Sequence, residues 1–133
     1  MGYRNYINIS AEEKGKNIYR VIPVCWLLEL FKTKKNTLLK PALWDDPFEN
    51  FILKGLGRLS NGKTASLGMR DLLYGQCWTL RRESDAMWRI YSSDKNGVKI
   101  RTTIKKLFES LYNVMPSRSR DVSCFIGKVK YFR

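Results

Sequence analysis

The sequence contains no histidine, and its three cysteines, Cys25, Cys77 and Cys124, are widely spaced. Without histidine the chain can assemble neither a Ser-His nor a Cys-His nucleophile, and histidine-based ribonuclease chemistry is excluded. Three thiolates without an imidazole make a poor zinc site, so we expect no bound metal. Each cysteine has apolar neighbours in the sequence, which favours buried, reduced thiols in a cytoplasmic protein.

Long apolar runs are also missing from the sequence. No segment approaches the length needed to span a bilayer, and the opening MGYRNYINIS is too polar for a secretory leader. We therefore expect no membrane association and a cytoplasmic location.

Acidic residues are scarce. The chain carries 12 Asp and Glu against 25 Lys and Arg, which gives a formal net charge of +13. Such an excess of positive charge favours polyanionic partners. Nucleic acid or a nucleotide is the commonest such partner, and an acidic protein such as an antitoxin or an inhibitor comes next. The alternative is a basic surface that is merely solvated.

The length of 133 residues and the apolar fraction of 44% fit one domain over residues 1–133. Alternating apolar residues predict strands, and apolar spacing near 3.6 residues predicts helices. The predicted strands span 17–22, 76–81, 98–102 and 122–131, and the predicted helices span 24–35, 85–92 and a segment after Thr103. This order predicts an α+β fold, a single compact domain with a small mixed or antiparallel sheet flanked by short helices.

Several local signals refine this prediction. Ser10 and Glu13 have the spacing of a capping box, and Ser84 and Thr103 stand at the starts of two predicted helices. Helix 24–35 carries an apolar stripe of Trp26, Leu27, Leu30 and Phe31.

The segment 57–68 is rich in Gly, Ser and Asn, and its composition predicts a mobile surface loop. Its GKT ending matches a phosphate-binding loop only in part. Arg58 occupies the place of the first glycine and no buried strand precedes it, so we interpret the match as coincidence.

Two stretches, WDDPFEN at 44–50 and CWTLRRESDAMWRIYSSDKNGVKIRTT at 77–103, accompany an opening strand IYRVI at 18–22. Together they resemble the bacterial family described as domain of unknown function 2971, over about residues 18–131. That family carries Asn-Asp-Pro-Phe-Glu, Cys-Phe-Ser, Met-Trp-x-x-Tyr and Lys-Gly-Val in this order. Here Asp45 replaces the usual Asn, and Trp78 and Thr79 replace Phe-Ser. The resemblance implies a role in bacterial or phage conflict, but no settled activity.

The order of elements also resembles ADP-ribosyltransferase-like folds, in which a first-strand Arg and a second-strand hydroxyl bind nicotinamide adenine dinucleotide (NAD). The resemblance gives these roles to Arg20 and Thr79. The helical pair Trp88 and Tyr91 would line the pocket, although core packing is the commoner role of such a pair. The late Glu of those folds has no counterpart in the last predicted strand, so Glu49 would stand in as acid or base.

Asp45, Asp46 and Glu49 form an acidic cluster in an otherwise basic chain. Carboxylates so placed can bind Mg²⁺, act as a general base or orient a ribose hydroxyl. The structural alternative is that they cap a turn and pair with a nearby Arg. The transferase hypothesis takes Glu49, Arg20 and Asp46 as catalytic residues, with NAD as the cofactor.

A second hypothesis assigns the function to the basic residues alone. The chain is then a non-enzymatic nucleic-acid-binding module, for example a subunit of a bacterial defence or toxin–antitoxin assembly. Lys128 and Lys130 are expected on one face of the last strand. The cations predicted to contact nucleic acid are Arg81, Arg82, Arg89, Lys99, Arg101, Lys128 and Lys130.

Overall fold

The computed structural model has an α+β fold, as the sequence predicts, and describes residues 5–43, 56–58, 61–62, 64–66, 72–113 and 123–130. The chain divides into two compact units. One contains residues 1–32 and 78–133, and the other contains residues 33–77. The single domain over 1–133 stays a prediction. The acidic cluster of Asp45, Asp46 and Glu49 lies outside the described residues.

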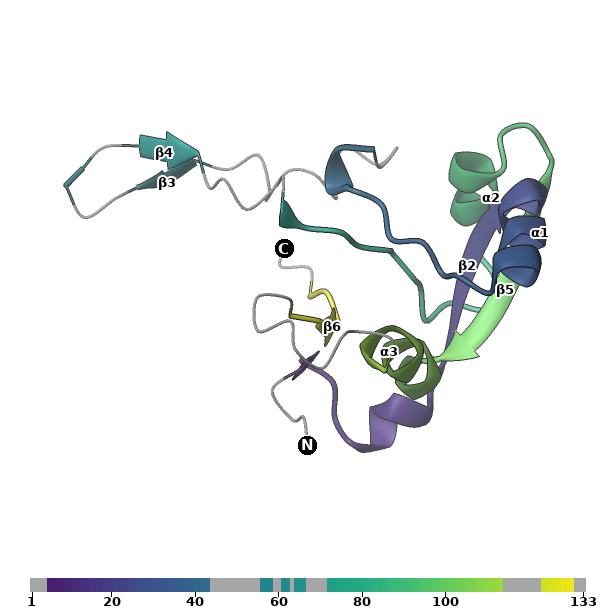
Figure 1. Cartoon of the computed structure of the whole chain (residues 1–133), viewed down its shortest axis with the longest axis horizontal. Helices are drawn as coiled ribbons and strands as arrows, with labels where there is room; N and C mark the ends of the chain where they lie inside the picture. The colour runs from purple at the N-terminus through teal and green to yellow at the C-terminus, as the bar shows by residue number, and fades with distance from the viewer. Residues whose placement is uncertain are drawn as a thin grey trace. The chain divides into compact units, whose positions relative to one another are not determined.

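The first unit is built on β2 (Asn17–Pro23) and β5 (Gly97–Thr103), which lie side by side in Figure 1. The two strands pair antiparallel along their whole length, with Asn17 opposite Thr103 and Pro23 opposite Gly97. Both confirm the strands predicted over residues 17–22 and 98–102. The connection between them is long, so their register is set by side-chain packing and not by a tight turn.

The hydrophobic core of this unit lies where β2 meets α3 (Ile104–Tyr112). Ile18 of β2 is buried against Ile104 and Leu107 of the helix. Thr103 caps this helix, because its hydroxyl oxygen accepts a hydrogen bond from the Lys106 amide at 3.2 Å. The predicted cap and the predicted apolar spacing of the helix are both confirmed. Half-buried side chains complete the cluster: Tyr6, Ile9, Trp78, Leu111 and Ile126.

Two further helices confirm the sequence predictions. The helix α1 (Val24–Thr33) follows β2 directly, and α2 (Asp85–Tyr91) precedes β5. The helix α1 ends two residues before the predicted end, and Lys34 then takes a left-handed φ of 58°, which is a usual way to stop a helix. Ser84 occupies the N-cap of α2, but its side chain makes no capping hydrogen bond.

The two ends of the described chain pair with each other. The strand β1 (Tyr6–Ile7) runs parallel to β6 (Ile126–Gly127), and the Lys128 amide donates to the Ile7 carbonyl at 3.0 Å. The sequence does not predict β1, and the predicted strand 122–131 is wrong in length. Because pairing ends at Gly127, Lys128 and Lys130 do not share the face of a strand.

A short 3₁₀ helix, η2 (Glu12–Gly15), follows β1. The capping box predicted for it is present. The Ser10 amide donates to the Glu13 carboxylate at 3.2 Å, and the Glu13 amide donates to the Ser10 hydroxyl at 3.3 Å.

The strand predicted over residues 76–81 is wrong, because this segment pairs with β2 at one residue only. Thr79 and Tyr19 exchange backbone hydrogen bonds of 2.8 and 2.9 Å. The Thr79 hydroxyl then accepts a hydrogen bond from the Arg81 amide at 3.1 Å. Such a side-chain turn directs the chain away from β2, so no longer ladder forms.

The second unit contains η3 (Pro41–Leu43) and a hairpin of β3 (Leu56–Arg58) and β4 (Thr64–Ser66). The loop predicted over 57–68 is therefore wrong at the paired residues. Gly62, with φ of 79°, lies between the two strands, where a residue without a side chain turns most easily. Elsewhere in this unit, Leu39 and Gly75 exchange backbone hydrogen bonds of 3.2 and 2.8 Å.

Within the described ranges, no helix is both long enough and apolar enough to cross a membrane. The cytoplasmic location stays a prediction.

Candidate nucleic-acid interface

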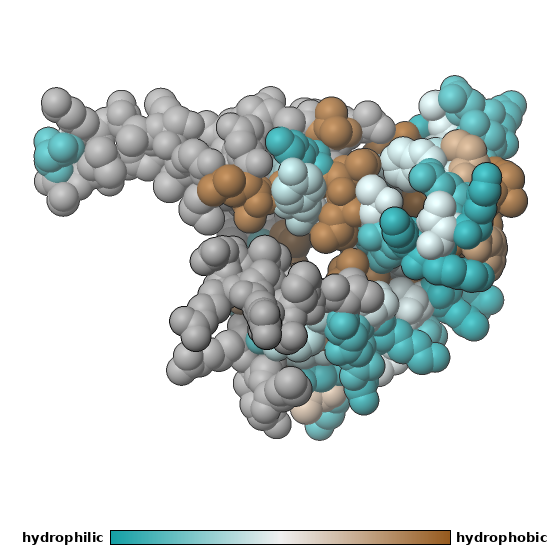
Figure 2. Space-filling model, viewed as in Figure 1, coloured by the Kyte–Doolittle hydropathy of each residue, from teal (hydrophilic) through white to brown (hydrophobic). Residues whose placement is uncertain are grey.

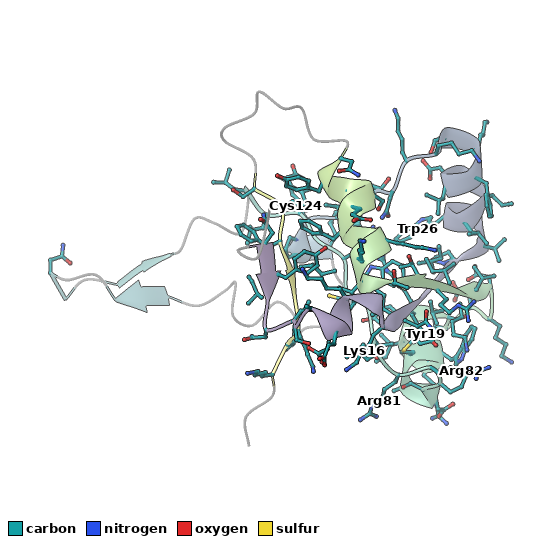
Figure 3. The ribbon with its side chains drawn as sticks, turned by 90° about the horizontal axis from the view of Figure 1, so that it is seen from below. Lys16, Tyr19, Trp26, Arg81, Arg82 and Cys124 are labelled. Carbon is teal, nitrogen blue, oxygen red and sulfur yellow. The ribbon has the colours of Figure 1, made fainter. Side chains whose placement is uncertain are left out.

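The backbone bridge between Thr79 and Tyr19 brings two distant basic segments together. Tyr19 lies opposite Arg101 of β5 on one side and opposite Thr79 on the other. Residues directly opposite each other in an antiparallel pair project from the same face. The side chains of Thr79, Tyr19 and Arg101 therefore share one face of the β2–β5 ladder. Figure 3 shows Arg81 and Arg82 in the same part of this unit as Tyr19.

Three exposed arginines belong to the two segments that meet at this bridge. Arg81 and Arg82 follow the turn at Thr79, and Arg101 projects from β5. All three side chains are exposed. In the described part of the chain, none of them forms an ion pair with a carboxylate. We call Arg81, Arg82 and Arg101 the arginine cluster.

Lys99 links β5 to the segment that carries two of these arginines. It lies opposite Val21, and so it projects from the same face as Arg101. Its ammonium group pairs with the Glu83 carboxylate and donates to the Arg82 carbonyl at 3.1 Å. The same nitrogen lies 6.0 Å from the centre of the Tyr19 ring. Only 24% of the Lys99 side chain is exposed, because Arg82 and Glu83 contact its ammonium group.

The Trp88 side chain of α2 also interacts favourably with the Glu83 carboxylate. The hydrogen bond from Lys99 is the main reason that the pKa of Glu83 is lowered from 4.5, and Trp88 contributes in the same direction. Glu83 thus ties the arginine segment to both β5 and α2. Sequence alone gives no role to Glu83, because its partner Lys99 lies sixteen positions further along the chain.

Two of the other predicted cations have carboxylate partners elsewhere in the unit. Arg89 pairs with Asp85 one helical turn earlier, at 2.7 Å, and both side chains are largely exposed. Lys128 pairs with Glu13 at 2.8 Å. Lys130 follows β6 and is exposed. The structure therefore brings together Arg81, Arg82, Lys99 and Arg101 of the predicted set.

The residues predicted to bind NAD do not gather on one face. Arg20 lies opposite Ile100, between Tyr19 and Val21, so its side chain projects from the other face of the ladder than that of Thr79. The Thr79 hydroxyl is already a hydrogen-bond acceptor for the Arg81 amide. Trp88 and Tyr91 are half-buried on α2. Glu49 and Asp46 lie outside the described residues.

The cysteines differ in exposure. Cys25 is exposed on α1, so the expectation that it is buried is wrong. Cys77 and Cys124 are half-buried, and burial raises the pKa of the Cys124 thiol. A raised pKa keeps this thiol protonated near neutral pH and lowers its reactivity. Among the described residues, no group of three acidic or cysteine side chains is arranged to hold a metal ion.

No family model, curated protein or solved structure matches this chain. The two family resemblances therefore stay predictions, and the site is interpreted from its own residues.

Proposed function

We propose that this protein is a nucleic-acid-binding module that contacts the phosphate backbone through the arginine cluster. One observation supports this proposal above the others. Two separate segments that meet at one backbone bridge carry three exposed arginines, and none of these forms a salt bridge with a carboxylate among the described residues.

The chemistry of the cluster suits phosphate. A guanidinium group donates two parallel hydrogen bonds to the oxygens of a phosphate and stays charged at any physiological pH. The net charge of +13 adds a long-range attraction that guides a polyanion to the surface. Binding of this kind releases counterions from the nucleic acid and weakens as the salt concentration rises.

Two features of the surroundings favour binding over catalysis. Glu83, the acid that borders the cluster, already pairs with Lys99, and its pKa is lowered. A carboxylate in that state is a poor general base or acid near neutral pH. Arg20 and Thr79 project from opposite faces of the ladder, which does not favour a shared dinucleotide site.

The test is a salt titration of binding. Fluorescence anisotropy would measure the affinity of the full-length protein for labelled single-stranded RNA, single-stranded DNA and duplex DNA between about 50 and 200 mM salt. We expect Arg101→Ala to weaken binding to all sequences and to reduce the slope of log K against log salt by about one. Arg81→Ala and Arg82→Ala should behave in the same way.

Arg89→Ala provides the matched control, because it removes one exposed arginine and the same unit of charge. The proposal predicts a clearly smaller loss for this variant. Equal losses for Arg89→Ala and Arg101→Ala would mean that net charge alone drives binding, and would contradict the assigned interface.

A parallel incubation with labelled NAD and nucleic acid tests the transferase hypothesis. Transfer of label that is lost in Arg20→Ala would replace the binding module with the transferase. Salt-sensitive binding without label transfer supports the module.

A further inference from the structure

Tyr19 is an aromatic residue that adjoins the arginine cluster. It lies in β2 directly opposite Arg101 of β5 and, on its other side, directly opposite Thr79. The turn at Thr79 leads on to Arg81. All of these residues belong to the first unit, so their arrangement is internal to it. An aromatic ring in this position offers a contact that phosphate alone does not use.

The strand pairing brings the Tyr19 and Arg101 side chains close together. Tyr19 exchanges both of its backbone hydrogen bonds with Thr79, at 2.8 and 2.9 Å. Its amide and carbonyl therefore point away from β5, and its pairing with Arg101 is of the non-hydrogen-bonded kind. In such a pair the Cα atoms are about 4.5 Å apart and the side chains are nearer than at hydrogen-bonded positions. The side chains of Tyr19 and Arg101 thus leave the sheet as close neighbours.

This face of the ladder is covered at one end and open at the other. Val21 and Lys99 project from it two positions along their strands from Tyr19 and Arg101. Val21 is only 3% exposed, and Lys99 pairs with Glu83 just before α2, which packs against β2. Arg101 is exposed, whereas the other residues of β5 are half-buried. The open end is therefore the end that carries Tyr19 and Arg101.

The opposite face of the ladder contributes to the hydrophobic core. Ile18 and Ile22 project from it and are each 5% exposed, and Ile18 packs against Ile104 and Leu107 of α3. In Figure 3 the ribbon of β5 passes between α1 and α2. Figure 2 shows the side of α1 and α3, where brown hydrophobic side chains lie among teal hydrophilic ones. The face of Tyr19 is thus the one from which an exposed arginine projects.

The Tyr19 side chain has the capacity for a further contact. It is half-buried, so the protein fixes part of it and solvent reaches the rest. Its hydroxyl group has no hydrogen-bond partner among the described residues, and its ring centre lies 6.0 Å from the Lys99 ammonium nitrogen. A ring that is already held in place loses little conformational freedom when a flat ligand stacks on it.

Nucleobases are the flat groups that accompany phosphate in nucleic acid. Any base can stack on a tyrosine ring, because every base has a π-face. The bases of a duplex are already stacked on one another, so an unpaired base reaches such a ring far more easily. Aromatic rings combined with cations that follow the backbone are a general means of binding single strands.

We propose that the arginine cluster and Tyr19 together bind single-stranded nucleic acid, with an unpaired base stacked on the Tyr19 ring and neighbouring phosphates at the arginines. This binding mode rests on the proposed function, because its phosphate contacts are those of the arginine cluster. It selects single strands over duplexes and gives Tyr19 a binding role.

Synthetic strands separate base stacking from phosphate contact. The probes are labelled oligothymidine and oligouridine of about 12 nucleotides, which is within the range of a single-strand site. A DNA duplex of the same length and a thymidine strand whose central nucleotides lack bases complete the set. Fluorescence anisotropy at one salt concentration measures the affinity of the full-length protein for each. We expect the unmodified single strands to bind about tenfold more tightly than the duplex and the abasic strand, and the tighter of the two identifies DNA or RNA.

Tyr19→Leu removes the ring and should weaken binding of the unmodified strand about tenfold, whereas its affinity for the abasic strand should stay close to that of the unaltered protein. Tyr19→Phe keeps the ring and should bind like the unaltered protein. Tyr74→Leu is the matched control. Tyr74 is 57% exposed and its ring centre lies 5.7 Å from the Lys40 ammonium nitrogen, but it belongs to the second unit. Its loss should leave the affinity unchanged.

Two kinds of failure can be distinguished. If no probe shows salt-sensitive binding, or if Arg101→Ala leaves binding unchanged, the proposed function itself is wrong. If Arg101→Ala weakens binding but the unaltered protein binds the abasic strand and the duplex as tightly as the unmodified strand, the phosphate interface stands and stacking on Tyr19 is wrong. That comparison uses no variant of Tyr19, so it decides the question even if Tyr19→Leu does not fold. Equal losses for Tyr19→Leu and Tyr74→Leu would also overturn the stacking role.

Discussion

The Glu13 carboxylate and the Lys128 ammonium group lie 2.8 Å apart, although 115 positions separate them in the chain. The same carboxylate accepts hydrogen bonds from the Ser10 amide at 3.2 Å and from Lys16 at 3.1 Å. These hydrogen bonds, that from Lys128 first, lower the pKa of Glu13 from 4.5 to about 2. The pair therefore joins the helical turn near one end of the chain to the segment that follows β6.

This lowered pKa makes a prediction about stability and pH. A carboxyl group with a lower pKa in the folded state stabilises that state above its unfolded pKa of 4.5, and the contribution disappears as the pH falls through about 2. We expect Glu13→Gln to be less stable than the unaltered protein at pH 7 and to lose less stability between pH 4.5 and 2. Urea unfolding at several pH values measures this difference. The prediction would be contradicted if the free energy of unfolding changed with pH in the same way for both proteins.

The Thr103 cap predicts a difference between two helix starts. Thr103→Ala removes the acceptor for the Lys106 amide and should lower the free energy of unfolding by about 0.5–2 kcal/mol. Ser84→Ala is the control, because the Ser84 side chain makes no capping hydrogen bond, and it should cost clearly less. Urea unfolding compares the two variants. A larger loss from Ser84→Ala would contradict the assignment of the cap.

Gly97 predicts a steric effect at the start of β5. A Cβ at this position would meet the Ser92 Cβ and Oγ at 2.6 Å and the Val21 side chain at 2.9 Å. Gly97→Ala should therefore lower the free energy of unfolding by about 1–3 kcal/mol. Gly127→Ala is the control, because its nearest neighbour, the Ile7 Cβ, would lie at an ordinary 3.4 Å. Thermal unfolding of both variants checks the prediction, and equal effects would refute it.

The pair of Lys99 and Glu83 predicts a positioning effect that rests on the proposed interface. Lys99→Met removes the link from β5 to Glu83 and to the Arg82 carbonyl, so the arginine cluster should become less ordered. We expect a several-fold loss of nucleic-acid affinity with little change in the salt slope, because this proposal gives Lys99 the role of positioning the arginines and not of contacting phosphate. A drop in the salt slope by about one would instead make Lys99 a direct contact.

A double-mutant cycle separates this effect from simple loss of charge. In Lys99→Met, the Glu83 carboxylate loses its main partner. Its negative charge is then no longer balanced by Lys99 and lies beside the arginines. Combining it with Glu83→Gln should recover part of the lost affinity. Additive losses in the double variant would show that the two residues act independently.

The sequence by itself determines the local elements of this protein. The residue types at 17–22 predict β2, and alternation predicts β5. Helical apolar spacing predicts α1 and α3, and short side-chain signals predict α2, the cap at Thr103 and the capping box at Ser10. These features depend on residues a few positions apart, so the sequence contains all the information they need. The excess of basic residues likewise indicates a polyanionic partner without reference to the fold.

Only the tertiary structure decides which of these residues act together. Pairing of Tyr19 with both Thr79 and Arg101 forms the arginine cluster, and contacts across the chain take Lys99 and Lys128 into ion pairs. Register across distant strands fixes the face of each residue, which is why Arg20 projects away from Thr79. The strand predicted at 76–81 fails for the same reason. Its composition suits a strand, but the turn at Thr79 removes the neighbouring backbone that a longer ladder requires.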